Sequence, residues 1–292
     1  MYVSIRDCMV AEDFPTPAAG LKALDLESVE IELTRDFEVR AFDSKDRLRL
    51  ENDADAEAYG KRLRNLGIHP CSLLTARDFS AGDPGDNIAW IARAIEIASI
   101  LGMTNIRIDS AMSRERELDF ETRVNLFAAG LGGALARTSG LTVALAIENH
   151  GFQGNSLAFL LSVFHRVGSE RIGSTLDTGN FYWRGYPLSE VYGILRLLAP
   201  YAKHTHLKNI RYPEDQREVM REAGWEYGQY VCPLDEGDID HGRVLRVLKD
   251  AGYEGDLCIE DESVGKLKTP EERIAVLQRD VRHTRELCEK LT

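Results

Sequence analysis

The sequence has few of the features that mark secreted, membrane-spanning or nucleic-acid-binding proteins. Its five cysteines, at positions 8, 71, 232, 258 and 288, are far apart, and no two form a CxxC pair. This pattern favours neither a disulfide framework nor a thiolate zinc site, so we expect reduced cysteines. The N-terminus lacks a basic segment followed by an apolar one, and no apolar run approaches the roughly 20 residues of a membrane span. We therefore expect a cytoplasmic protein that does not associate with membranes.

Positive charge is also scarce. The chain has a net charge of −12 over 292 residues, and no Lys/Arg-rich run offsets it locally. Because such a chain repels a phosphate backbone, we expect no nucleic-acid partner. A hydrophobic content of 43% is ordinary for a globular protein with a sizeable core. Length alone leaves open one large domain or two small ones.

Strand-like and helix-like segments alternate along the chain. A parallel sheet built from βαβ units is the expected result, and eight strands are the number that closes a (β/α)₈ barrel. We therefore predict an α/β protein with a single TIM-barrel domain over residues 1–292. The expected strands are 2–8, 28–33, 68–74, 105–109, 141–148, 172–177, 203–207 and 255–261, and the expected helices include 48–66, 87–101, 120–136, 157–167, 188–198, 241–251 and 270–291.

Charged residues end four of these strands. Glu148, Asp177, His206 and Glu260 each follow small or apolar residues that share their strand face. A charge at the end of a buried face is costly unless it is paired or bound to a metal, and in a TIM barrel the C-terminal strand ends meet at the active site. We therefore predict that these four residues hold one divalent metal ion. Such a ligand set suits Mn²⁺, our first choice, and also Mg²⁺, Co²⁺ or Zn²⁺.

A long polar segment follows the seventh strand. Glu148 to Asp177 and Asp177 to His206 are each 29 residues, whereas His206 to Glu260 is 54 residues. The excess lies in residues 210–240, a connection longer than an ordinary βα loop. We expect it to be a lid or substrate wall that contributes Trp225 or Tyr227. The alternatives are a mobile surface insertion and an interface in a homo-oligomer.

The motifs IENHG, LDTGNF, HTHLKN and CIEDE, in this order and at strand ends, resemble those of the xylose isomerase-like TIM-barrel superfamily. The resemblance covers essentially the whole chain. It implies a divalent metal held by Glu148, Asp177, His206 and Glu260, with the two glutamates also moving protons. The chain departs from the family pattern at Asn180, where many members have a histidine. A second metal is therefore poorly supplied, and a three-zinc phosphodiesterase centre is not expected.

Other polar and aromatic residues near these strand ends are candidates for contact with substrate. Lys208 shares a face with His206 and can stabilise a developing enolate oxygen, or instead form a salt bridge with Glu260 or Glu262. His204 lies deeper on the same face, where we expect a packed, hydrogen-bonded residue. The predicted substrate-binding set is His150, Asn180, Lys208, Trp183, Arg184, Trp225 and Tyr227.

The function predicted from these features is a metal-dependent isomerase or epimerase of a ketose-like or other polyhydroxylated carbonyl compound. One glutamate would remove a proton next to the carbonyl and the other would return it, which requires their pKa values to rise toward the working pH. The alternative is a lyase that expels a β-hydroxyl or glycosidic oxygen, acting on an inosose, dehydroshikimate or 3-keto-glycoside. A third alternative is a non-catalytic sugar-binding or scaffold subunit.

Overall fold

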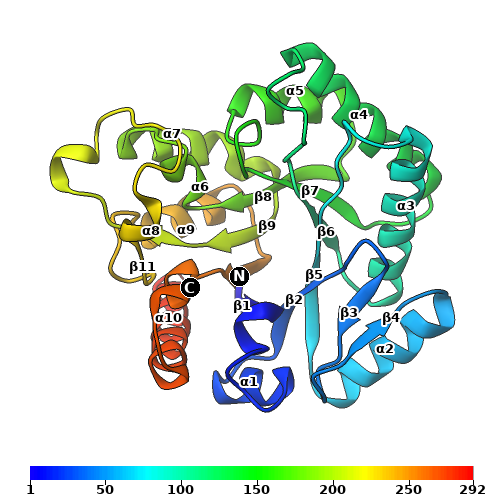
Figure 1. Ribbon diagram of the computed structural model, residues 1–292, viewed down its shortest axis with the longest axis horizontal. Helices are drawn as coiled ribbons and strands as arrows, with labels where there is room; N and C mark the ends of the chain where they lie inside the picture. Colours follow the sequence, from blue (N-terminus) through cyan, green and yellow to red (C-terminus); the bar gives the residue numbers. More distant parts are fainter. Residues whose placement is uncertain (292) are drawn as a thin grey trace.

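A computed structural model describes residues 1–291, in which eight parallel strands close into a barrel (Figure 1). The pairing order is β1-β12-β9-β8-β7-β6-β5-β2, and β2 pairs with β1 to complete the circle. The expected (β/α)₈ barrel is confirmed. Its strands are β1 (Tyr2–Arg6), β2 (Ser28–Glu32), β5 (His69–Thr75), β6 (Asn105–Ile108), β7 (Ala144–Glu148), β8 (Ile172–Asp177), β9 (Ala202–Leu207) and β12 (Asp256–Ile259).

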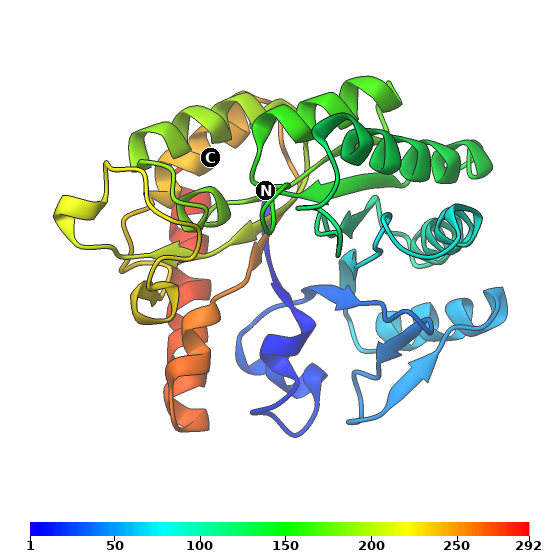
Figure 2. The ribbon, with the colours of Figure 1, turned by 45° about the horizontal axis from the view of Figure 1, so that its top comes forward.

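Helices surround the barrel, as Figures 1 and 2 show. The larger ones are α1 (Pro17–Ala23), α2 (Asp53–Asn65), α3 (Pro84–Ile100), α4 (Phe120–Arg137), α5 (Leu157–Val167), α7 (Leu188–Leu198), α9 (His241–Asp250) and α10 (Pro270–Glu289). Two short helices, α6 (Asn180–Trp183) and α8 (Tyr227–Tyr230), and 3₁₀ turns at Asp7–Val10, Ala199–Tyr201, Glu214–Gln216 and Glu262–Lys266 lie in the connections. Within residues 1–291 no helix is long and apolar enough to cross a membrane.

The hydrophobic core lies between the strands and the helices. Phe127 of α4, for example, packs its ring on Phe79 and Phe159, with ring centroids 4.7 and 5.3 Å apart. Several strands are buried on both faces, which is why they read as nearly continuous apolar runs. The barrel interior, by contrast, holds the polar side chains Glu30, His204 and His206, all at most 1% exposed. The polar site is therefore built inside the barrel.

The region before α2 differs from the prediction of a helix over 48–66. A hairpin of β3 (Glu38–Arg40) and β4 (Arg47–Arg49) takes up residues 47–49, with Leu48 opposite Val39. The helix begins only at Asp53, because Asn52 and Asp55 form a capping box in which each side chain accepts a hydrogen bond from the other's backbone N–H. The sequence-based expectation for residues 48–52 was wrong.

The beginning and the end of the long segment after β9 are tied to each other. It starts in β10 (Asn209–Ile210), which pairs antiparallel with β11 (Val231–Cys232). The Asn209 side chain donates hydrogen bonds to the carbonyls of Leu234, at 2.7 Å, and Ile239, at 3.0 Å. Gly237 makes this approach possible, since a Cβ there would lie 2.0 Å from Asn209 Cγ. In Figure 1 the segment lies beside β9, with α8 and β11 at the left.

Candidate metal centre

The four predicted ligands converge inside the barrel at the carboxyl ends of four consecutive strands. Glu148 ends β7, Asp177 ends β8, His206 lies in β9 and Glu260 directly follows β12. The strand register places Asp177 beside His206. One ligand atom from each of the four residues lies within 4.8 Å of all the others. All four side chains are buried, so the group is shielded from bulk water.

The backbone after β8 aims the Asp177 carboxylate. The N–H groups of Gly179 and Asn180 donate to Asp177 Oδ1 at 2.8 and 2.6 Å, which leaves Oδ2 free to face the cluster. The Asn180 side chain in turn donates to Glu148 Oε1 at 3.2 Å. Asn149, which sequence reasoning passed over, fixes the β7 end to β8 through hydrogen bonds of 2.8 and 3.0 Å with the backbone of Asp177. Asn180, the residue that departs from the family pattern, is therefore in contact with Glu148, one of the four predicted ligands.

Two buried oxygens make the cluster suitable for a cation. Asp177 Oδ2 and Glu260 Oε2 are buried, and their close partner is the Lys208 ammonium, which lies 3.2 and 2.8 Å away from them. Buried carboxylate oxygens are costly unless enough positive charge or hydrogen-bond donors surround them. Three carboxylates and one imidazole with two such oxygens form a donor set that fits a single divalent metal ion.

Fixed positive charges also lie against the ligands. The guanidinium of Arg107, in β6, contacts Glu148, and that of Arg6, in β1, contacts Glu260. Lys208 Nζ additionally lies 2.8 Å from Glu262 Oε1. Lys208 thus forms the salt bridges with Glu260 and Glu262 that were the alternative to stabilising an enolate oxygen. The positive charges of Arg107, Arg6 and Lys208 therefore offset part of the negative charge of these carboxylates.

These neighbours lower the pKa of both glutamates, whereas proton transfer by them would require it to rise. Burial alone raises the pKa of Glu148, but Arg107 and His206 outweigh it and bring the pKa to about 2. For Glu260, Lys208, His206 and Arg6 likewise outweigh burial and lower the pKa well below its usual value. Asp177 differs, because burial raises its pKa to about 7. Both glutamates are therefore ionised at neutral pH.

At the mouth, His150 pairs with an aspartate that sequence reasoning missed. Its Nδ1 lies 3.0 Å from Asp109 Oδ1, just beyond β6. The hydrogen bond to Asp109 raises the pKa of His150 above its usual value. The His150 side chain is 43% exposed, and nothing in residues 1–291 forms a hydrogen bond with its Nε2. His150 is therefore open to a molecule entering the mouth.

The remaining predicted substrate-binding residues are Tyr227 and Trp225 of the long segment, and Trp183 and Arg184 after β8. Tyr227, in α8, donates its hydroxyl to Glu262 Oε2 at 2.7 Å, next to Lys208. Trp225 stacks on Tyr230, with ring centroids 5.6 Å apart, and so packs within the long segment. Trp183 and Arg184 lie at the end of the short helix α6, which follows β8. Arg184 lies 4.6 Å above the Phe152 ring, and the Trp183 carbonyl accepts the Gly224 N–H at 2.8 Å.

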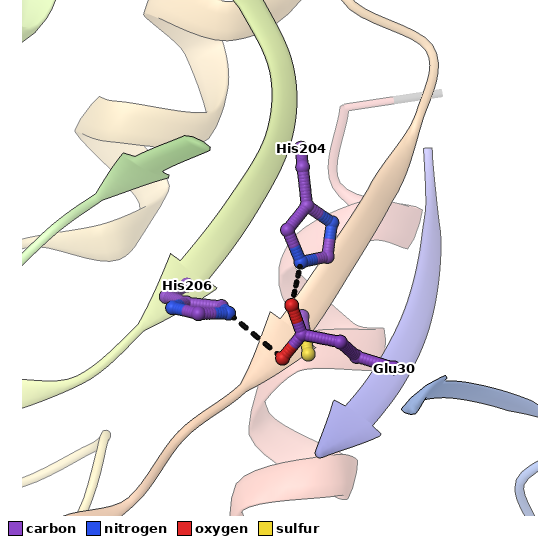
Figure 3. Close-up of side chains that lie close together, drawn as sticks. Glu30, His204 and His206 are labelled. Carbon is purple, nitrogen blue, oxygen red and sulfur yellow. Dashed lines mark hydrogen bonds and ion pairs between the residues drawn. The ribbon is translucent and has the colours of Figure 1, made fainter. Parts of the chain in front are cut away.

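Behind the ligands, His204 is the packed, hydrogen-bonded residue that was expected. It lies between Glu30 of β2 and Asp256 of β12, and Glu30 also contacts His206 (Figure 3). Glu30, Arg6 and Arg107 were missed by sequence reasoning. The sequence does carry a signal for Glu30 and Arg107, because each is a charged residue that interrupts an apolar strand, in SVEIE and NIRI respectively.

Comparison with known proteins shows the family to which this chain belongs. The xylose isomerase-like TIM barrel family model matches residues 19–287. The chain belongs to this family. An inosose dehydratase of Klebsiella pneumoniae is 29% identical over 157 residues, covering 52% of this chain and 51% of that protein. The chain thus spans about half the length of the curated relatives it matches.

Solved structures share this family fold over nearly the whole chain. The IOLI protein with a zinc atom has a TM-score of 0.71 at 15% identity and covers 99% of both chains. An L-ribulose 3-epimerase has a TM-score of 0.69 at 17% identity, covering 99% of this chain and 95% of the other. At this level of identity the similarity establishes the fold and leaves the reaction open.

Proposed function

We propose that this chain is a divalent-metal-dependent lyase that removes water from a polyhydroxylated ketone of the inosose class. The observation that carries the proposal is the buried group of Glu148, Asp177, His206 and Glu260, whose ligand atoms all lie within 4.8 Å of one another. The inosose dehydratase relatives support elimination over isomerisation, which was our first prediction from sequence. The zinc atom of the IOLI structure supports a divalent ion, with Zn²⁺ and Mn²⁺ as the candidates.

The ligand set suits chemistry next to a carbonyl. A bound divalent ion supplies a Lewis acid that lowers the cost of negative charge on the carbonyl oxygen. Glu148 and Glu260, both ionised, are ready to accept a proton without first losing one. Their low pKa makes them weak bases, so contact with an acidified C–H bond is needed for the transfer. The buried position keeps water away from the reacting carbon.

In the proposed elimination, a glutamate carboxylate takes the proton from the carbon next to the carbonyl. The electron pair of that C–H bond forms the new C=C bond, and the C–O bond on the neighbouring carbon breaks. His150 donates a proton from Nε2 to the departing hydroxyl, which leaves as water. Asp109 holds the imidazole through Nδ1 and so directs Nε2 toward the mouth. Lys208 and Tyr227 are placed to bind substrate hydroxyls.

The second candidate is the isomerase or epimerase. It is favoured by one observation, namely that two ionised glutamates face the same cluster from different strands. One can remove a proton from the substrate, and the other can return it on the opposite face. This route needs no departing hydroxyl and therefore no donor such as His150.

A substrate panel in D₂O distinguishes the candidates. Protein loaded with Zn²⁺ or Mn²⁺ is incubated with inososes, ketoses and 3-keto-glycosides, and the Asp177→Asn variant serves as the metal-depleted control. The proposal expects an unsaturated product from an inosose and none with the control. Deuterium in a rearranged sugar would instead establish the epimerase. Unchanged substrates throughout would favour a binding or scaffold role.

A further inference from the structure

We infer that Glu30 is the positioning residue that fixes His206 as a metal ligand, and that His204 and Asp256 hold Glu30 for that task. The inference rests on the proposed metal centre. Glu30 lies in β2, 176 positions before His206 in the sequence, and is 1% exposed. Its carboxylate forms hydrogen bonds of 2.9 Å with His204 Nε2 and 3.0 Å with His206 Nε2. Figure 3 shows one oxygen directed at each ring.

The contact with Glu30 determines which nitrogen of His206 faces the metal ligands. An ionised carboxylate only accepts hydrogen bonds, so His206 Nε2 carries the hydrogen. The other nitrogen, Nδ1, lies 3.1 Å from Glu148 Oε1 and 3.4 Å from Glu260 Oε2. Because both neighbours are carboxylates, Nδ1 also carries a hydrogen in the metal-free protein, and this is the hydrogen that an ion among these carboxylates would replace. A ligand histidine whose second nitrogen donates to a carboxylate is held in one tautomer and one ring orientation.

A further pair of residues stabilises Glu30 in this buried position. His204 Nδ1 lies 2.9 Å from Asp256, so its two ring nitrogens both face carboxylates and each donates. The ring thus places one positive charge between two negative ones. Ser4 Oγ also donates to Asp256, at 3.1 Å. Arg6 Nε lies 3.6 Å from Glu30 Oε2 and is the other cation facing this carboxylate. A buried carboxylate with these partners stays in place to accept from His206.

An alternative is that Glu30 and its neighbours bind a metal ion themselves. Glu30, His204, His206 and Cys258 offer ligand atoms within 4.8 Å of one another, so an ion could itself bind in this group. However, contacts of 2.9 and 3.0 Å are ordinary N–H···O lengths and satisfy both Glu30 oxygens without an ion. The hydrogen-bonded reading is therefore favoured, and metal stoichiometry separates the two.

The decisive variant is Glu30→Gln. An amide has one acceptor oxygen and one donor NH₂ group, so it cannot accept from both rings. If its NH₂ faces His206, Nε2 must accept and loses its hydrogen, so the hydrogen that the ring keeps is the one on Nδ1, where the metal should bind. We expect affinity for Zn²⁺ or Mn²⁺ to fall by about 10- to 100-fold, the range seen for such partners of ligand histidines. The matched control is Glu32→Gln in the same strand, because Glu32 contacts Arg47, at 2.6 Å, and no histidine.

Two measurements separate positioning from general stabilisation. Metal dissociation constants come from competition with a chromophoric chelator, and ring ¹⁵N shifts of the metal-free protein report the protonation of each His206 nitrogen. We expect both to change in Glu30→Gln and neither in Glu32→Gln. If Glu30→Gln does not fold, Asp256→Asn takes its place with a smaller expected loss of affinity. Unchanged affinity in the folded variant would overturn the inference even if its Tm falls.

The outcomes for the wild-type protein are also informative. A wild-type chain that binds no divalent ion overturns the metal centre and this inference together. A chain that binds one ion, with the same affinity in Glu30→Gln, overturns the inference alone. Two ions per chain, one of them lost in Cys258→Ser, would make Glu30 a ligand and not a positioning residue.

Discussion

The ammonium of Lys208 lies 3.2 Å from Asp177 Oδ2, one of the oxygens that face the candidate metal centre. The same ammonium lies 2.8 Å from Glu260 Oε2. A fixed cation therefore lies close to two of the oxygens that are proposed to bind a divalent ion. When that ion binds, Lys208 retains a third partner, Glu262, at 2.8 Å. The two cations share carboxylates, so each influences the binding of the other.

This arrangement predicts tighter metal binding when the charge of Lys208 is removed. In Lys208→Met, the repulsion between the ammonium and the divalent ion disappears, and we expect affinity to rise by about tenfold, or about 1.4 kcal/mol. Turnover should fall, because the residue is also placed to bind substrate. Isothermal titration with Mn²⁺ measures the first effect, and Lys208→Arg, which keeps the charge, is the control. Equal or weaker affinity in Lys208→Met would contradict this account of the pair.

The hydroxyl of Tyr227 is predicted to act on substrate and not on the metal. Tyr227→Phe removes the hydrogen bond to Glu262 and a polar group at the mouth. We expect KM to rise several-fold, in line with about 1 kcal/mol for a hydrogen bond, while metal affinity stays at the wild-type value. Steady-state kinetics on the substrate found in the panel provide the test. Trp225→Phe, which alters ring packing within the segment, should leave KM closer to wild type. A Tyr227→Phe enzyme with unaltered KM would remove this residue from the pocket.

A second carboxyl pair, Asp280 and Asp261, predicts a dependence of stability on pH. Asp280 of α10 is fully buried, its Oδ1 accepts the Leu234 N–H at 3.0 Å, and burial together with Asp261 raises its pKa to about 9. In the unfolded chain the pKa is about 3.9. Between these values the folded state binds the extra proton, so the stabilisation is complete at low pH and is lost as pH rises through this window.

Asp280→Asn keeps the acceptor oxygen and removes the titration. We expect its Tm to be close to wild type at about pH 4 and higher than wild type at pH 8, with a difference of no more than about 1.4 kcal/mol for each pH unit crossed. Thermal unfolding at several pH values measures this. The control is Asp25→Asn, whose side chain is 89% exposed and pairs with Arg285. Parallel Tm curves for wild type and Asp280→Asn would show that Asp280 is ionised in the folded protein.

The barrel and the convergence of Glu148, Asp177, His206 and Glu260 could be predicted because both depend on local patterns. Each ligand ends an apolar strand, and parallel strands of a closed barrel bring their ends together. The hairpin at 38–49 was not predicted because its strands are only three residues long, too short for an alternating pattern to emerge. Leu48 looked like the start of the apolar face of α2, although it packs opposite Val39.

The electrostatics of the site could not be predicted, because they depend on partners distant in sequence. Glu30 and His206 are 176 positions apart, and Arg6 and Glu260 are 254 apart. Nothing local in β2 indicates that Glu30 meets two histidines. The lowered pKa of the glutamates could not be predicted for the same reason, since the contacts of Arg107 and Arg6 with these carboxylates arise only when the barrel closes.

The central claim is that Glu148, Asp177, His206 and Glu260 bind a single divalent ion. Elemental analysis after loading with Zn²⁺ or Mn²⁺ and removal of excess ion tests it most directly, in wild type and in Asp177→Asn and His206→Ala, with Asp25→Asn as the surface control. The account predicts about one ion per chain in wild type and in the control, and less than about a tenth of that in both site variants, because each loses a ligand. Wild-type metal content and affinity in both Asp177→Asn and His206→Ala would contradict it.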